Sequence, residues 1–96
     1  MSTIRNLMLV VAPVYCTTRR EMDGRGTNRN IVHAREAVAW VARQRGKTWG
    51  VIGREMRRHH SSVIAMVRRA DGRRRASEPF RELTDSLLKG VANDMQ

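Results

Sequence analysis

The chain has 96 residues, 41% of them hydrophobic, and a formal net charge of +10 from 19 Lys and Arg against 9 Asp and Glu. This length allows one small domain and excludes a nucleotide-hydrolysing module with anything beside it, while the apolar content excludes a disordered tail. Of the 19 cations, 17 are arginine, whose planar fork suits bidentate contacts to phosphate and guanine. The charge therefore predicts a polyanionic partner.

Cysteine content and hydropathy bear on location. The single cysteine, Cys16, excludes an internal disulfide framework and fits a reducing cytoplasm. The longest apolar run, residues 7–14, contains Pro13, lacks a clear cleavage site and is too short to span a bilayer. We therefore expect a cytoplasmic, nucleoid-associated protein with no membrane partner.

The first third of the chain predicts one helix and a basic loop. Residues 3–15 form an amphipathic pattern that Pro13 should kink or end in its last turn. Its apolar face consists of Ile4, Leu7, Met8 and Val11. A short helical turn through Met22 should follow, capped by Thr17 or Thr18, and Gly24 and Gly26 mark a loop.

Residues 30–44 carry the strongest helix signal. An apolar stripe runs along this segment and consists of Ala34, Ala37, Val38, Val41 and Ala42. Three charged residues are expected off the stripe, namely Arg35, Glu36 and Arg43. Asn30 is the predicted N-terminal cap, and Gly46 is the predicted terminator.

Residues 48–69 read as two short helices joined by a tight, basic turn, with Thr48 as the cap of the first helix. The inward stripes consist of Val51, Ile52 and Met56 on the first helix and Val63, Ile64 and Val67 on the second. The second helix shows hydroxyls and cations on its outer face. This pattern is typical of a helix-turn-helix that lays its second helix in the DNA major groove.

The second helix of this pair has an ambiguous start. His59 is a mediocre cap, whereas Ser61 or Ser62 would be a good one, so the helix begins somewhere in residues 59–63. We expect it to end by Gly72. Residues 73–75 would then form a basic linker that is either solvated or in contact with phosphate.

A closing helix is predicted after Ser77, which can cap it, with Pro79 in its first turn. Its inward stripe consists of Phe80, Leu83, Leu87, Leu88 and Val91. No segment alternates like a β-strand. The predicted fold is all-α: one domain over residues 1–96, a small helical bundle with a leading helix and basic loop (1–29), a long helix plus helix-turn-helix (30–72) and a closing helix (76–92).

Two side-chain types have competing interpretations. Trp40 is predicted to pack at a helix junction, whereas for Trp49 packing and stacking on a base are equally open. The His and Ser residues at positions 59–62 could suggest a metal site or a nucleophile, but no Cys, His or carboxylate cluster completes either one. We therefore predict no enzymatic activity, metal, cofactor or small-molecule substrate.

Three groups of residues point to a known family. Ala34-Arg35 begin a long helix that continues Ala37-Val38-Ala39, Ile52-Gly53 lie in the next helix, and residues 58–63 read Arg-His-His-Ser-Ser-Val. These residues resemble the C-terminal DNA-binding domain, domain IV, of the bacterial replication initiator DnaA, a member of the Trp-repressor-like helix-turn-helix folds. The resemblance covers residues 31–91 and, more loosely, the first helix.

The resemblance implies which residues read bases. In the family, a His and two hydroxyl residues at the start of the second helix reach major-groove base edges, and these correspond to His60, Ser61 and Ser62. Including their neighbours, the predicted base-reading residues are His59, His60, Ser61, Ser62 and Ala65.

Backbone contacts are implied in the same way. Arg35 would contact phosphate, and Trp49 and Gly50 would touch the backbone at the start of the first helix of the pair. Arg25 or Arg29 would enter the adjacent minor groove from the basic loop. With the cations around the helix pair, the predicted backbone and minor-groove residues are Arg25, Arg29, Arg35, Lys47, Trp49, Gly50, Arg58, Arg68 and Arg69.

Departures from the family pattern suggest a different target sequence. His59 replaces an Asp, Ser61 and Ser62 replace two Thr, and Glu36 replaces a Gln. These changes remove an acceptor for cytosine amino groups and methyl contacts to thymine. The sequence also lacks a Gly-rich phosphate loop, so we expect a module without the initiator's ATPase.

The favoured hypothesis is a stand-alone module that binds double-stranded DNA as a monomer or weak dimer. It would regulate transcription or replication, and a phage or other mobile element is a fitting source. The alternatives are a non-specific RNA- or DNA-binding protein, for which the arginine excess suffices, and a protein-interaction adaptor with an acidic partner.

Overall fold

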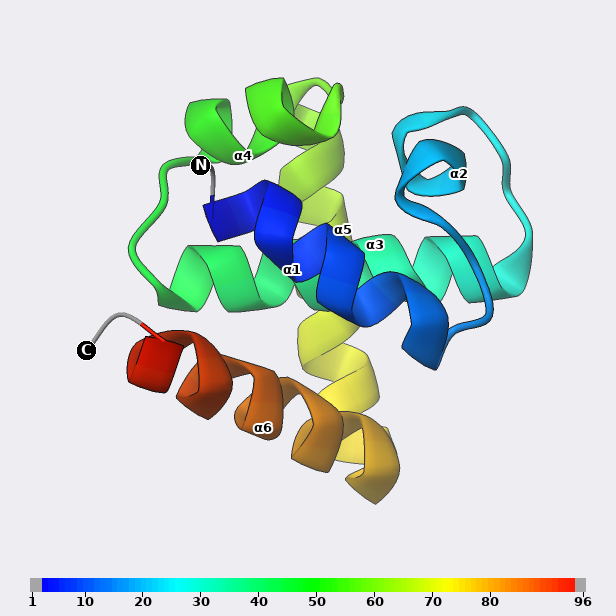
Figure 1. The fold of residues 1–96 in the computed structure, drawn as a ribbon. Coiled ribbons are helices and arrows are strands. Elements are labelled where there is room, and N and C mark those ends of the chain that lie inside the picture. The colour runs from blue at the N-terminus through cyan, green and yellow to red at the C-terminus, as the bar shows by residue number, and fades with distance from the viewer. Residues whose placement is uncertain (1–2, 95–96) are drawn as a thin grey trace.

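The computed structural model describes the backbone of residues 3–94 and the side chains of residues 3–90. Within this part of the chain the protein forms helices and no strands, so the predicted all-α class is confirmed (Figure 1). In chain order the helices are α1 (Thr3–Val14), α2 (Arg19–Asp23), α3 (Arg29–Gln44), α4 (Trp49–Met56), α5 (His60–Ala76) and α6 (Glu78–Asp94).

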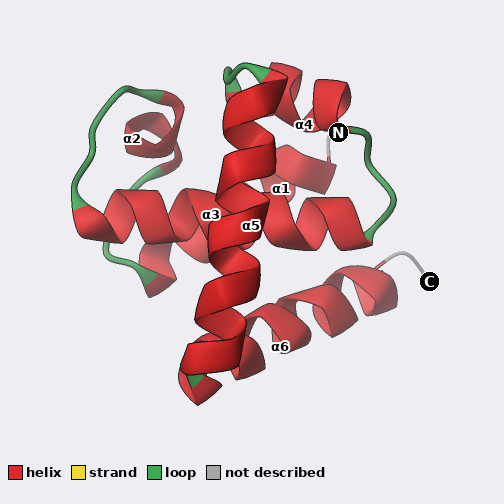
Figure 2. Cartoon of the chain, turned by 180° about the vertical axis from the view of Figure 1, so that it is seen from behind, coloured by secondary structure: helices red, strands yellow, loops and turns green. Residues whose placement is uncertain are grey.

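Helix α3 lies at the centre of the bundle, because every other helix packs against it. In Figures 1 and 2, α1 and α5 cross α3 on opposite sides, while α4 and α6 lie toward the two ends of α5. The predicted apolar stripe is fully buried, as expected for Ala34, Ala37, Val38, Val41 and Ala42. Arg35 and Glu36 are buried as well, so the expectation that these two residues lie off the buried face is wrong. A helix covered on all sides leaves no solvated face for them.

Several predicted helix ends are confirmed by their capping hydrogen bonds. The hydroxyl oxygens of Thr18, Thr48 and Ser77 each accept from the backbone amide of the third residue of the following helix. Helix α1 ends one residue after Pro13. Gly46, which follows the C-cap residue Arg45 of α3, has φ of 85°, the left-handed conformation that commonly ends a helix.

Two predicted boundaries are wrong. The cap of α3 is Asn28 and not Asn30: its Oδ1 accepts from the Asn30 amide at 2.9 Å, so the helix begins at Arg29. Helix α5 does not end by Gly72 but continues to Ala76, so residues 73–75 form its last turn and not a linker. This turn is held by tertiary contacts, since Arg73 pairs with Glu36 and Arg74 pairs with Asp85 on α6.

Trp40 packs at the junction of α3 and α5, as predicted. It is 6% exposed, its Nε1 donates to Asp71 Oδ1 at 2.8 Å, and the Arg74 guanidinium lies 4.0 Å from the ring centroid. The predicted stripe of α6 contributes Phe80 to the core and Leu83, Leu87 and Leu88 as half-buried residues. The side chain of Val91 lies outside the described residues.

Candidate nucleic-acid interface

The turn between α4 and α5 depends on a glycine. Arg57 ends α4 in the left-handed region at φ 57°, and the Arg58 amide donates to the Gly53 carbonyl at 2.8 Å. A Cβ atom on Gly53 would lie 2.5 Å from the Arg58 carbonyl oxygen, closer than real side chains approach. Gly53 therefore lets the chain fold back closely enough for α5 to begin at His60.

His59, rather than either serine, caps α5. Its Nδ1 accepts from the Ser61 amide at 3.2 Å and lies 2.8 Å from Ser61 Oγ. A ring nitrogen that accepts carries no proton, so the neutral ring has its N–H at Nε2. The ambiguous start is thereby resolved, with both serines in the first turn of α5.

One face of α5 is open along its length. Figure 2 shows α5 crossing in front of α3, with no other helix in front of it. The exposed residues on this face recur at helical spacing and are Ser61, Ser62, Arg68, Arg69 and Gly72, with half-buried Ala65 between them. The opposite face is buried through Val63, Met66, Val67 and Ala70. Such a helix combines a packed side with a polar, cationic side that fits a DNA groove.

The predicted base-reading residues lie together at the N-terminal end of α5. His59, His60, Ser61 and Ser62 are exposed, and Ala65 follows one turn later. The ring centroids of His59 and His60 are 4.2 Å apart. Four hydrogen-bonding side chains are therefore presented by four consecutive residues, the cap and the first three residues of α5.

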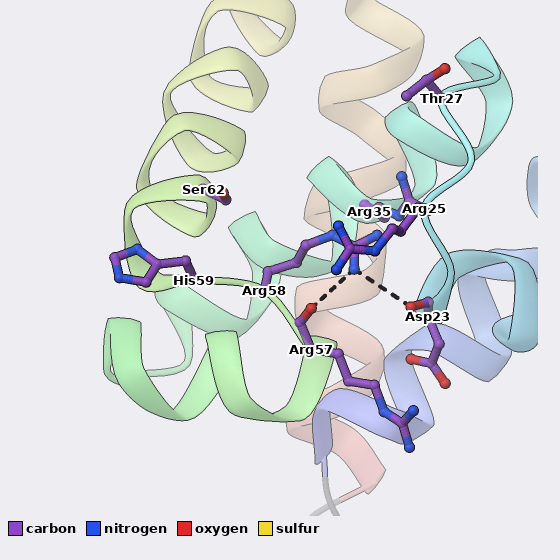
Figure 3. Close-up of a pocket in the computed structure, with 8 residues that line it drawn as sticks. All are labelled: Asp23, Arg25, Thr27, Arg35, Arg57, Arg58, His59 and Ser62. Carbon is purple, nitrogen blue, oxygen red and sulfur yellow. Dashed lines mark hydrogen bonds between the residues drawn. The ribbon is translucent and has the colours of Figure 1, made fainter.

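A basic pocket with a volume of about 710 Å³ lies beside this end of α5 (Figure 3). Its lining residues are Asp23, Arg25, Thr27, Arg35, Arg57, Arg58, His59 and Ser62. Asp23 is the one acid among them. Figure 3 shows Arg25, Arg35 and Arg58 gathered near the centre, whereas the Arg57 guanidinium points away from them. The pocket concentrates positive charge next to the start of α5 and therefore favours an anion.

Arg35 is placed differently from the implied phosphate contact. Its side chain is buried, 6% exposed, and donates to the carbonyls of Met22 at 2.8 Å, Gly26 at 2.6 Å, Gly24 at 2.7 Å and Glu21 at 3.2 Å. Burial lowers the pKa of the guanidinium, the positive charge of Arg58 lowers it further, and Asp23 opposes the change. The N–H groups of Arg35 therefore form hydrogen bonds within the chain, to the segment that precedes α3.

Arg58 contacts the same segment from the other side. Its Nη2 donates to the Gly24 carbonyl, and its Nη1 donates to the Arg57 carbonyl at 3.0 Å and the Asp23 carbonyl at 3.5 Å. The last two bonds are drawn in Figure 3. Arg58 is half-buried. The turn of the helix-turn-helix is therefore tied to the loop that carries Arg25.

Lys47, Trp49 and Gly50 lie at the other end of α4 from the base-reading residues. The eight residues of α4 rise about 12 Å between these two groups. Trp49 is half-buried, and the Arg43 guanidinium lies 4.2 Å from its ring centroid, so one face of the ring is occupied. Gly50 is exposed, with open space where a Cβ atom would lie. This end of α4 forms a second, separate group of polar and basic residues.

The remaining predicted cations lie along the exposed edges of the bundle. Arg68 is exposed on α5, and Arg29 is exposed as the first residue of α3. Arg69 is 63% exposed, and its Nη1 lies 3.9 Å from Glu36 Oε2, so it is loosely paired within the chain. Arg69 also borders a smaller hollow, of about 230 Å³, with Ser62, Ala65 and Arg58.

Sequence reasoning missed three residues of the basic pocket, Asp23, Thr27 and Arg57. Arg57 adjoins Arg58 in a run of cations, which was a usable signal. Thr27 follows Gly26 in the loop and carries no motif that marks it.

The described part of the chain contains no group of three or more His, Cys, Asp or Glu placed to hold a metal ion. Over the same residues, no helix is both long and apolar enough to cross a membrane.

The close turn, the capped α5 and its open polar face define a helix-turn-helix domain. Comparison with family models agrees with this class: the model described as "Bacterial dnaA protein helix-turn-helix" matches residues 4–70. The chain therefore belongs to this family of DNA-binding helix-turn-helix domains. The match includes α1 and ends within α5, so α6 lies beyond it. A comparison with individual curated proteins gave no match.

Proposed function

We propose that this protein binds double-stranded DNA by laying the first two turns of α5 in the major groove, as a regulator of transcription or replication. The observation that carries the proposal is the exposed start of α5, a helix whose opposite face is buried. The exposed side chains there are His59, which caps the helix, and His60, Ser61 and Ser62 in its first turn. B-form DNA admits an α-helix in its major groove, where the base edges are distinguishable. The protein would act at the nucleoid as a monomer or weak dimer.

In the proposed interface, one group of residues supplies affinity for any DNA and another group distinguishes one base from another. Arg25, Arg29, Arg57 and Arg68 are exposed and would contact phosphates, which gives a sequence-independent, salt-sensitive contribution. The residues at the start of α5 would discriminate bases, at about 1–3 kcal/mol for each good contact. Lys47, Trp49 and Gly50 would touch the backbone at the far end of α4. Arg58 and Arg35 would serve the interface indirectly, because their donors bind carbonyl groups of the chain.

Fluorescence anisotropy with duplex DNA and with duplex RNA of the same sequence tests this proposal. Tighter binding to DNA is expected, since the A-form major groove of RNA is too deep and narrow for α5. Equal affinity for both duplexes would overturn the proposal and favour a non-specific coating protein. Loss of all binding at physiological salt would favour an adaptor with an acidic partner.

The salt dependence of binding separates the two kinds of contact. Arg68→Ala should reduce the slope of log affinity against log salt by about 1, because it removes one phosphate contact. His60→Ala should weaken binding with the slope unchanged. A reduced slope for His60→Ala, with an unchanged slope for Arg68→Ala, would mean that α5 is not oriented as proposed.

A further inference from the structure

Two arginines from different parts of the chain converge on one short segment. The guanidinium groups of Arg35, on α3, and Arg58, in the turn before α5, together donate to the backbone carbonyl oxygens of residues 21, 22, 23, 24 and 26. The Gly24 carbonyl accepts from both side chains. The C-terminal end of α2 and the loop after it are therefore held by charge-assisted hydrogen bonds on two sides.

Arg25 lies between the two held positions. Gly24 and Gly26 flank it, and a glycine-rich loop of this kind loses much conformational freedom when it becomes ordered. With both neighbouring carbonyls fixed, the loop is already ordered before any ligand binds. Arg25 is exposed, and Figure 3 shows its side chain close to those of Arg35 and Arg58.

The same bonds connect Arg25 to the reading end of α5. Arg58 is followed directly by His59, the cap of α5. The Arg58 amide also donates a hydrogen bond to the Gly53 carbonyl at 2.8 Å. A displacement of Arg58 would therefore move both the loop and the first turn of α5. The hydrogen bonds of Arg58 therefore fix the distance between the loop that carries Arg25 and the first turn of α5.

We propose that Arg35 and Arg58 are positioning residues, which hold Arg25 at a fixed place relative to the start of α5 so that both contact one duplex together. This inference rests on the proposed DNA binding. The benefit is preorganisation, because the entropy of ordering the loop is lost on folding and not on binding. Neither arginine needs to contact DNA for this role.

A double-mutant cycle with Arg25→Ala and Arg58→Lys tests the coupling on a fixed mixed-sequence duplex of about 20 base pairs, two helical turns. Lysine keeps the charge of Arg58 but not its fork of donors. Arg25→Ala alone should weaken binding about tenfold, whereas in the Arg58→Lys background it should weaken binding less than about twofold. In the matched control, an Arg68→Lys background, Arg25→Ala should still weaken DNA binding by the full factor of about ten. Additive effects in both cycles would overturn the proposal.

A measurement without DNA separates this inference from the proposed function. Backbone NMR order parameters for the amides of Arg25 and Gly26 should be near 0.85 in the native chain and fall below about 0.6 in Arg58→Lys. Unchanged values alongside weaker DNA binding would assign Arg58 a direct DNA contact and overturn the positioning role. If the native chain binds no DNA, the proposed function fails, while the order parameters still decide whether Arg58 holds the loop. Arg35→Lys provides a second variant, and thermal denaturation shows whether each variant folds.

Discussion

Glu36 and Arg73 form an ion pair that joins the central helix α3 to the last turn of α5. Glu36 Oε1 lies 2.5 Å from Arg73 Nη1, and the Glu36 side chain is completely buried. Arg69 approaches the other carboxylate oxygen at 3.9 Å. Glu36 lies inside the bundle on α3, so the pair supports the orientation of the last turn of α5 against the central helix.

Removing the partner of this buried carboxylate should be costly. Arg73→Met is expected to lower the free energy of unfolding by about 3 kcal/mol, at the lower end of the range for broken buried pairs, because Arg69 remains nearby. Adding Glu36→Gln should recover part of the loss. Urea denaturation provides the measurement, and Arg75→Met, at an exposed position in the same turn, should change stability by no more than about 0.5 kcal/mol. A loss below about 1 kcal/mol for Arg73→Met would mean that the pair does not stabilise α5.

Gly53 is expected to tolerate no side chain. In Gly53→Ala the new Cβ atom meets the Arg58 carbonyl at 2.5 Å, so the turn must open. We expect the free energy of unfolding, measured by chemical denaturation, to fall by about 1–3 kcal/mol. DNA binding should also weaken, because Arg58 and the start of α5 move. Native stability in this variant would show that the turn can relax without cost.

Gly72 offers the opposite case within α5. It lies on the open face of the helix, and a Cβ atom there would have no neighbour within 4 Å. Gly72→Ala should therefore raise stability by about 0.5–1 kcal/mol, the difference in helix propensity. Thermal denaturation measures this gain. A decrease would indicate that α5 is not continuous through residue 72.

His33 should make stability depend on pH. Burial lowers its pKa in the folded protein below the usual 6.5, the positive charges of Arg73 and Arg29 lower it further, and Glu36 opposes them. The unfolded chain therefore takes up this proton first, so the contribution of His33 to stability is complete above pH 6.5 and is lost as pH falls through the lower folded value. His33→Gln should flatten this part of the profile in denaturation experiments between about pH 5 and 7.5. Parallel profiles for the two proteins would contradict this assignment.

The sequence predicted the helices where local signals are strong. Thr48 and Ser77 cap because a hydroxyl reaches the free amides of the next turn, and the apolar stripe of α3 packs because its spacing matches the helix period. These features depend on neighbours within a few residues. They could therefore be predicted from the sequence.

The cap of α3 was misplaced by two residues through a local contact, since Asn28 accepts from the Asn30 amide. The larger errors arose where distant residues decide the outcome. Helix α5 continues through Asp71 and Gly72 because Arg73 pairs with Glu36, which lies far away along the chain. Arg35 is buried because the carbonyls of another segment surround it. Neither partner could be identified without the arrangement of the helices. For the candidate site, the exposed residues at the start of α5 were predicted, but the loop contacts of Arg35 and Arg58 were not.

The central claim is that α5 reads a DNA sequence, and selection from a random double-stranded pool at near-physiological salt tests it most directly. Parallel selections with His60→Ala and Ser61→Ala probe the reading end, and Ser86→Ala, at an exposed position on α6, is the matched control. We predict one enriched motif, which His60→Ala and Ser61→Ala blur and Ser86→Ala leaves intact. No enrichment, with binding that only weakens as salt rises, would contradict sequence reading by α5.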